Sequence, residues 1–306
     1  MLGSQCIGKW HGILTQLGID QSHLTGKHGP CPICSAGKDR WRFDNKKGRG
    51  DWICSVCGSG DGFDLLMRVK GYGFKEAASE VEEVIGQVET QPVQKKADPR
   101  PALQRIGAGL QRLDGKDPAS LYLRHRGLHG IASFGLRYHP GLVYFDKGER
   151  LGTFPAMVAK VCNVRGTGET YHVTYLTQDG RKADVPAVKK IMSPINTING
   201  AAIRLAAMAE HIGLTEGIEN GLAVMEGEGL PCWTACTAGG IETFEPPAEI
   251  KRVTIFADND HNYRGHKAAY ILANRLIERN GIAADVIVSP YGDYLDSLLK
   301  SKRAAA

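Results

Sequence analysis

Four of the eight cysteines in this 306-residue sequence form two closely spaced pairs. Cys31-x2-Cys34 and Cys54-x2-Cys57 are separated by 19 residues. This spacing is typical of a site in which four thiolates hold one zinc ion in a tetrahedron. The sequence therefore predicts one structural Zn²⁺ on these cysteines. Because four thiolates complete the ligand set, we interpret His28 as a neighbour rather than a ligand.

The segment between the cysteine pairs, KDRWRFDNKKGRGDW, mixes cations with aromatic side chains. If RWRF is a strand, Trp41 and Phe43 lie on one face and the arginines on the other. Aromatic rings beside cations are what single-stranded nucleic acid needs. The plainer alternative is that Trp41, Phe43 and Trp52 form the small core of the zinc unit. The basic cluster favours nucleic-acid binding, and the role of the aromatic residues stays open.

Carboxylates follow two predicted strands in the last third of the chain. Glu216 is the last residue but one of the stretch HIGLTEG, and Asp258 and Asp260 stand at the end of KRVTIFADND. The carboxyl ends of parallel strands meet at one edge of a sheet, where ligands gather. Carboxylate oxygens there suit Mg²⁺, and two such ions stabilise the attacking and leaving oxygens in phosphoryl transfer. Acidic pairs also cap helices, so the combination with Glu216 is the stronger signal.

The elements that must position these residues follow from periodicity. From residue 211 onward, strands alternate with helices, which predicts a parallel sheet flanked by helices. Earlier segments predict a helix at 10–19, a helix within 118–128, and strands at 153–164 and 169–177. The predicted fold class is multidomain, α+β and α/β. Its expected parts are an N-terminal zinc ribbon with helices (1–90), a linker (91–102), a basic α+β segment (103–208), a parallel-sheet domain (209–300) and a frayed tail (301–306).

Charge and composition narrow the class of protein. Residues 91–210 carry 18 Lys and Arg against 9 Asp and Glu, whereas residues 211–306 carry 9 against 13. A basic middle beside an acidic end suggests phosphate binding beside cation binding. No apolar run approaches the roughly 18 residues of a membrane span. The start lacks a secretory signal pattern, so we expect a cytoplasmic protein whose clustered thiols hold metal.

The C-terminal pattern resembles a Toprim domain, which bacterial-type primases, topoisomerases and some nucleases share. The shared features are the Glu-Gly strand end, the later Asp-x-Asp strand end and the α/β alternation. The ribbon (HGPCPIC…WICSVCGSGDGFDLL) followed by a basic segment and Toprim resembles the phage and plasmid class of DNA primases. The resemblance covers roughly residues 8–85 and 115–300, and the ribbon is its most specific part.

The resemblance implies a set of site residues. Glu216, Asp258 and Asp260 would be catalytic and bind Mg²⁺ or Mn²⁺. Asn220 stands where many primase-type Toprim domains have an acid, and Asp293 or Asp296 could supply that carboxylate. Cations of the basic segment, together with two after Asp260, would hold nucleotide phosphates; these candidates are Arg165, His172, Lys182, Lys189, Lys190, Arg264 and Lys267.

The resemblance implies template-directed synthesis of short RNA primers on single-stranded DNA from ribonucleoside triphosphates. The alternatives are a Toprim nuclease, which would use the same metal site for hydrolysis, and a catalytically inactive module that binds single-stranded DNA. The sequence contains no Gly-x4-Gly-Lys-Ser/Thr loop, so we expect any helicase to be a separate partner. Cys232 and Cys236 are spaced too widely for a zinc knuckle, and we interpret them as buried thiols.

Overall fold

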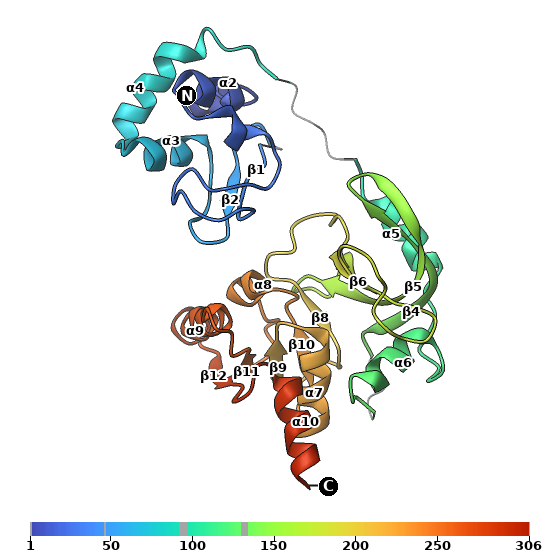
Figure 1. The fold of residues 1–306 in the computed structure, drawn as a ribbon. Coiled ribbons are helices and arrows are strands. Elements are labelled where there is room, and N and C mark those ends of the chain that lie inside the picture. Colours follow the sequence, from blue (N-terminus) through green and yellow to red (C-terminus); the bar gives the residue numbers. More distant parts are fainter. Residues whose placement is uncertain (1, 46, 92–96, 130–133, 306) are drawn as a thin grey trace. The chain divides into compact units, whose positions relative to one another are not determined.

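The structure is a computed structural model that describes residues 2–45, 47–91, 97–129 and 134–305. The chain forms two compact units, Met1–Ala97 and Asp98–Ala306 (Figure 1). The domain boundaries expected from the sequence stay predictions within these units. None of the helices in the described ranges has the length and hydropathy that a membrane span requires.

The first unit packs helices around a three-stranded antiparallel sheet of order β1-β2-β3. Its core joins Trp10, Ile13 and Leu14 of the second helix to Leu65 and Leu66 of the third. The elements are α1 (Leu2–Gln5), α2 (Trp10–Gln16), a 3₁₀ turn η1 (Gln21–Leu24), β1 (Trp41–Phe43), β2 (Trp52–Cys54), β3 (Gly58–Gly60), α3 (Gly62–Lys70) and α4 (Phe74–Ile85).

The second unit is built on one nine-stranded sheet of order β12-β11-β9-β10-β8-β5-β6-β7, with β4 on β5. Its strands are β4 (Leu136–Asp146), β5 (Glu149–Cys162), β6 (Gly168–Tyr175), β7 (Lys189–Ile191), β8 (Ala202–Arg204), β9 (His211–Thr215), β10 (Cys232–Thr234), β11 (Arg252–Ala257) and β12 (Ala283–Val288). Strands β9 to β12 pair in parallel, and β8 joins them to β5 by antiparallel pairing. The sheet therefore runs without a break from the basic segment into the C-terminal α/β segment.

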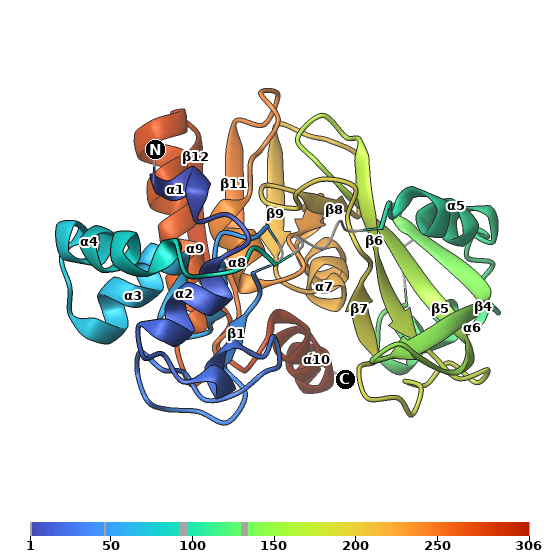
Figure 2. The ribbon, with the colours of Figure 1, turned by 90° about the horizontal axis from the view of Figure 1, so that it is seen from above.

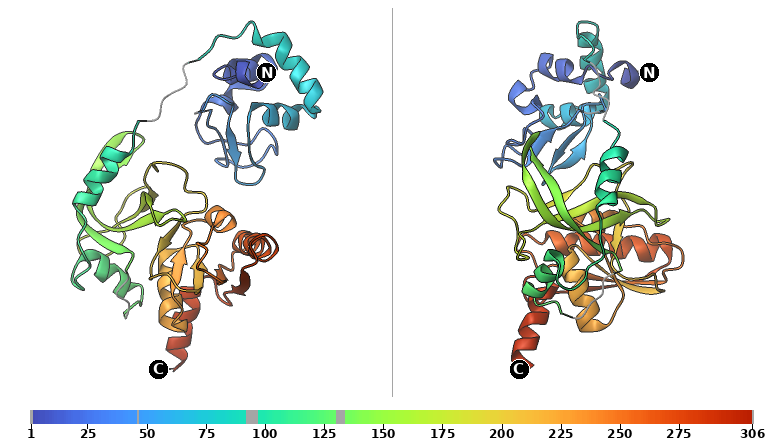
Figure 3. Two further views of the ribbon diagram at one scale, coloured as in Figure 1. Left: turned by 180° about the vertical axis from the view of Figure 1, so that it is seen from behind. Right: turned by 90° about the vertical axis from the view of Figure 1, so that its right-hand side faces the viewer.

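Helices cover both faces of this sheet. They are α5 (Arg100–Ala108), α6 (Pro118–His125), α7 (Ile218–Glu228), α8 (Ala238–Thr243), α9 (Arg264–Arg275), a π-helical turn η2 (Leu276–Asn280) and α10 (Tyr294–Ala305). Helices α8 and α9 share one core with β9 and β11, whereas α6, α7 and α10 share another. Helices α7 and α10 lie side by side (Figure 3). Helix α5 lies against the long β4–β5 ribbon (Figure 2).

The predicted fold class is confirmed, and the differences have local causes. Helix α5 begins at Arg100, inside the predicted linker, because Pro101 lies in the first turn, where a helix tolerates proline. Strand β4 was missed because Pro140 and Gly141 interrupt its pattern at a bulge. The tail expected to fray continues α10 through Ala305.

Candidate active site

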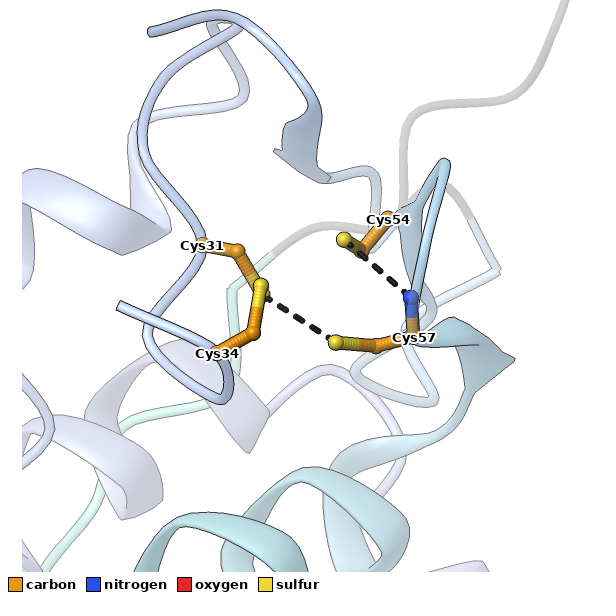
Figure 4. A group of neighbouring side chains, drawn as sticks. All are labelled: Cys31, Cys34, Cys54 and Cys57. Carbon is orange, nitrogen blue, oxygen red and sulfur yellow. Dashed lines mark hydrogen bonds between the residues drawn. The ribbon is translucent and has the colours of Figure 1, made fainter. Parts of the chain in front are cut away.

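The thiol cluster lies in the first unit, where Cys54 ends β2 and Cys57 precedes β3. The four Sγ atoms of the two cysteine pairs all lie within 4.8 Å of one another (Figure 4). The backbone N–H groups of Val56 and Cys57 point at the Sγ of Cys54, at 3.5 and 3.4 Å. Donors aimed at sulfur favour the thiolate, which is the form that binds zinc. This donor set fits one tetrahedral Zn²⁺, and exposed His28 contacts the carbonyl of Asp39 instead.

The aromatic residues of the insert are buried, so they offer no base-stacking face. Trp41, Phe43 and Trp52 are each at most 2% exposed. The rings of Trp41 and Trp52 stack with their centroids 5.2 Å apart. Their indole N–H groups donate to the carbonyls of His23 and Asp61. The plainer alternative was correct for all three, because helices pack over this face of the small sheet.

A polar cavity of about 340 Å³ lies in the second unit at the carboxyl ends of the parallel strands. Four carboxylates line it: Glu216 follows β9, Asp258 follows β11, Asp293 lies in the loop after β12, and Glu219 lies on α7. Three cations also line it: Arg126 at the end of α6, Lys182 in the loop after β6, and Lys189 on β7. The cavity therefore joins a carboxylate group to a cation group drawn from distant parts of the sequence.

The carboxylates repel one another in a half-buried setting. Burial and then the charges of Glu216, Asp293 and Asp260 raise the pKa of Asp258 to about 7. Burial, with the charge of Asp260, also raises the pKa of Glu216. Within the described chain, only the four cysteines have three or more potential ligand atoms all within 4.8 Å, so the acids stand further apart than the thiols.

Asn220 holds Asp258 in place. Its side-chain amide donates to Oδ1 of Asp258 at 2.9 Å and accepts from the backbone N–H of Leu295 at 3.2 Å. Asn220 is 5% exposed. An amide in place of an acid thus fixes one carboxylate oxygen of Asp258 without adding a charge.

Glu219 anchors the cation side of the cavity. The ammonium of Lys189 lies 2.8 Å from both carboxylate oxygens of Glu219, and the hydroxyl of Tyr122 donates to Oε1 at 2.6 Å. Burial would raise the pKa of Glu219, but the charge and hydrogen bond of Lys189 and the bond from Tyr122 outweigh it and lower the pKa to about 2. The Lys189–Glu219 ion pair connects β7 to α7, and the hydrogen bond from Tyr122 connects α6 to α7.

His172 lines the same cavity as a neutral ring. It is 8% exposed, and burial, with the charge of Lys189, lowers its pKa to about 4. Its Nδ1 is buried and bonds no described residue. It is therefore a polar surface at neutral pH rather than a cation.

The other residues predicted from the sequence lie outside the cavity lining. Lys190 projects from the opposite face of β7 to Lys189, where its ammonium lies 3.7 Å from the ring centroid of Tyr144. Asp296 is exposed on α10, and Asp293 lines the cavity in its place. Asp260 and Arg264 are exposed, although both charges act on Glu216.

Two more predicted cations are exposed and line no part of the cavity. Arg165 lies in the turn between β5 and β6, and Lys267 lies on α9. The prediction for Arg165 rested on charges that recur around an expected hairpin, and the prediction for Lys267 rested on its place near the start of the helix after Asp260. Neither feature separates a binding residue from a solvated one.

Sequence reasoning missed Tyr122, Arg126 and Glu219. Tyr122 and Arg126 stand four positions apart, so they share one side of α6, and this spacing was the available signal. The Nε of Arg126 is buried and bonds no described residue. Glu219 follows Glu216 by three residues on the adjoining helix turn, but only the tertiary fold brings Lys189 to it.

Comparisons with known proteins match three consecutive parts of the chain. Residues 26–63 match the zinc-binding domain of primase-helicase. Residues 97–205 match a domain of unknown function (DUF7146), and residues 211–304 match the Toprim domain. These matches confirm the expected pairing of a primase-type four-cysteine ribbon with Toprim.

Several solved structures are distantly similar. The primase fragment of the bacteriophage T7 primase-helicase protein is 17% identical, over 91% of this chain and 96% of that one, with a TM-score of 0.42. The Aquifex aeolicus primase (zinc-binding and RNA polymerase domains) is 16% identical, over 99% and 84%, with a TM-score of 0.45. A DnaG primase catalytic domain bound to single-stranded DNA is 14% identical, over 67% and 75%, with a TM-score of 0.47. We draw no inference from likenesses this distant.

The family matches, together with the thiol cluster, identify what the chain contains. The chain joins a zinc-binding domain of the primase-helicase family to a Toprim domain through a segment that matches a domain of unknown function.

Proposed function

We propose that this chain is a DNA primase that makes short RNA primers on single-stranded DNA by metal-dependent nucleotidyl transfer. The observation that carries the proposal is the cavity in which Glu216, Asp258 and Asp293 share a lining with Arg126, Lys182 and Lys189. The pairing of a primase-type zinc ribbon with Toprim supports it. A nucleotide triphosphate needs both groups, since its phosphates bind cations directly and bind acids only through a metal.

The acids fit Mg²⁺ or Mn²⁺. Burial and then the charges of three neighbouring carboxylates raise the pKa of Asp258 to about 7. A divalent cation bound among these carboxylates would remove the repulsion between their charges. Glu216, Asp258 and Asp260 would hold the cation, with Asp293 rather than Asp296 as a further ligand. When bound, the ion would stabilise the charge that develops in phosphoryl transfer.

The chain's own cations would position the triphosphate. In the proposed reaction the 3′-hydroxyl of one nucleotide attacks the α-phosphate of the next, and pyrophosphate leaves. Lys189 is held by Glu219, so its ammonium is fixed before the substrate arrives. A preorganised cation lowers the cost of reaching the transition state. Arg126 and Lys182 would contact the remaining phosphate oxygens, and exposed Arg264 would approach from the acid side.

The zinc-binding unit would hold the template through its uncovered sheet face. The aromatic residues lie on the covered face of this sheet. The opposite face carries Arg42, Ile53 and Ser59, which are neighbours across the three strands. Ile53 is 48% exposed. Exposed Lys47 and Arg49 would add phosphate contacts beside it.

We also propose that the protein is cytoplasmic and works with a separate helicase.

The test supplies single-stranded DNA, labelled ribonucleotides, and Mg²⁺ or Mn²⁺. The proposal expects short labelled oligomers, lost by at least about 10²-fold in Asp258→Asn because a preorganised charge at the reacting group is removed. Asp296→Asn is the matched control, an exposed carboxylate on the neighbouring helix, and keeps the activity.

Two other outcomes would overturn the primase assignment. Shortened DNA without incorporation would make the protein a Toprim nuclease. DNA binding with neither reaction, unchanged by Asp258→Asn, would make it an inactive binding module.

A further inference from the structure

A second cationic groove lies on the other face of the same sheet. Adjacent residues of a strand point to opposite faces. On β6, His172 lines the acidic cavity and its neighbour Tyr171 lines the groove. On β8, Ile203 lines the acidic cavity and its neighbour Arg204 lines the groove. Two strands thus place the groove opposite the acidic cavity.

The groove lies between α5 and strands β4, β5 and β6, and it comprises two adjoining cavities of about 540 and 320 Å³. They share Gly107, Lys160 and Tyr171, so together they make one elongated depression. An elongated depression suits a chain better than a compact small molecule.

The groove is strongly cationic. Arg137, Lys160 and Arg204 line the larger cavity, and Lys160 and Arg100, which pairs with Asp98, line the smaller one. No Asp or Glu among the described residues lines either cavity. Part of the basic surplus of residues 91–210 therefore lies away from the acidic cavity.

Two polar groups in the groove have no partner within the described part of the chain. These are the ammonium of Lys160, an exposed residue of β5, and the hydroxyl of Tyr171. By contrast, Arg204 donates to the carbonyls of Asn163 and Val164 and packs on a tryptophan ring. Fixed arginines with an uncommitted ammonium and hydroxyl form a ready set of phosphate donors.

Aromatic surface accompanies these donors. Phe134 lines the groove and is 71% exposed, and the ring of Tyr171 lies at the junction of the two cavities. Cations that follow a backbone beside aromatic rings are the usual means of binding single strands. We propose that this groove binds a single-stranded polynucleotide, with its phosphates on Lys160 and the arginines and a base on Phe134.

The test measures binding of the full zinc-loaded chain to a fluorescein-labelled oligothymidylate of about 16 nucleotides, by anisotropy over a range of salt concentrations. Lys160→Glu weakens binding about tenfold and lowers the salt slope by about 1, because a phosphate contact is lost. Lys116→Glu reverses an exposed lysine of the same unit that lines neither cavity, and changes affinity less than about twofold.

Phe134→Ala separates stacking from charge. It weakens binding of oligothymidylate about fivefold but leaves an abasic strand of the same length unaffected. Photo-crosslinks from 4-thiothymidine fall on the peptides that carry Phe134 or Tyr171.

Equal effects of Lys160→Glu and Lys116→Glu, with no crosslink in those peptides, would overturn the proposal. Tighter binding of a short labelled polyglutamate than of oligothymidylate, weakened by Lys160→Glu, would also overturn it, because the groove would then favour an acidic peptide. Neither result depends on whether the chain makes primers.

Discussion

The thiol cluster and the acidic cavity are assembled in different ways. The thiols come from one stretch, Cys31 to Cys57, and lie within 4.8 Å of one another on a small sheet. The carboxylates follow three strands of a large sheet, and neighbouring polar side chains bind them or act on their charge. Asn220 binds Asp258, and the charge of Arg126 acts on Asp293. We therefore expect the zinc unit to depend on its metal for its fold and the second unit to fold without a divalent cation.

Removal of zinc gives the largest expected effect. Structural zinc contributes on the order of 10 kcal/mol in small zinc-binding folds, so chelation or Cys54→Ser should abolish the unfolding transition of the first unit. Three of the four tryptophans, Trp10, Trp41 and Trp52, lie in this core, so near-ultraviolet circular dichroism reports it. Cys162→Ser, in the second unit, is the control. An unchanged spectrum in protein shown by elemental analysis to lack zinc would refute the contrast.

Acid should destabilise the second unit through His172. Its pKa is lowered to about 4, so between the usual value of about 6.5 and pH 4 the unfolded chain binds the proton more tightly. Stability is therefore lost as pH falls through this window, by up to about 3 kcal/mol. The raised pKa of Asp258 has the opposite effect, because it adds stability as pH falls. The contribution of His172 is therefore taken as the difference in the free energy of unfolding between the original protein and His172→Phe.

The measurement is the free energy of unfolding in urea from pH 7 to 4.5. His172→Phe should lose less stability on acidification than the original protein, and exposed His129→Phe should follow the original. Parallel curves for the protein and His172→Phe would show that the ring is not held neutral by burial.

Breaking the Lys189–Glu219 pair should cost less, about 2 kcal/mol. Lys189→Met leaves the buried carboxylate of Glu219 with the hydroxyl of Tyr122 as its remaining partner in the described chain. The expected cost is below the usual 3–5 kcal/mol for a buried pair because the Lys189 side chain is 41% exposed. Adding Glu219→Gln should restore part of the loss, which urea unfolding of the three variants measures. Additive losses would mean that the pair does not hold β7 to α7.

The smallest expected effects are on Mn²⁺ binding, and they distinguish Asp293 from Asp296, which the sequence alone could not do. Asp293→Asn should weaken Mn²⁺ binding about tenfold, since Asp293 lines the cavity. Exposed Asp296→Asn should change it less than about twofold. Calorimetric titration with Mn²⁺ measures both, and the reverse order would return Asp296 to the site.

The sequence predicted what local spacing or strand ends determine. The four cysteines could be predicted because the two cysteines of a Cys-x2-Cys pair lie close together in a short turn. Glu216 and Asp258 could be predicted because the carboxyl ends of parallel strands meet at one edge of a sheet. Lys189 and Lys190 differ in the face of β7 that they occupy, which depends on a register that charge alone does not reveal.

Burial was the other limit of sequence reasoning. Whether the aromatic face of the three-residue strand β1 is covered depends on helices far along the chain. The partnership of Tyr122 with Glu219, 97 positions apart, likewise exists only in the tertiary fold.

Binding of Mn²⁺ to zinc-loaded protein, followed by electron paramagnetic resonance, tests the central claim most directly. We predict that the protein binds Mn²⁺ at the acidic cavity, that Asp258→Asn weakens this binding by about 100-fold, and that the circular dichroism of the second unit is the same with and without Mn²⁺. Equal Mn²⁺ binding by the protein and Asp258→Asn would contradict the account, as would a second unit that folds only when Mn²⁺ is present.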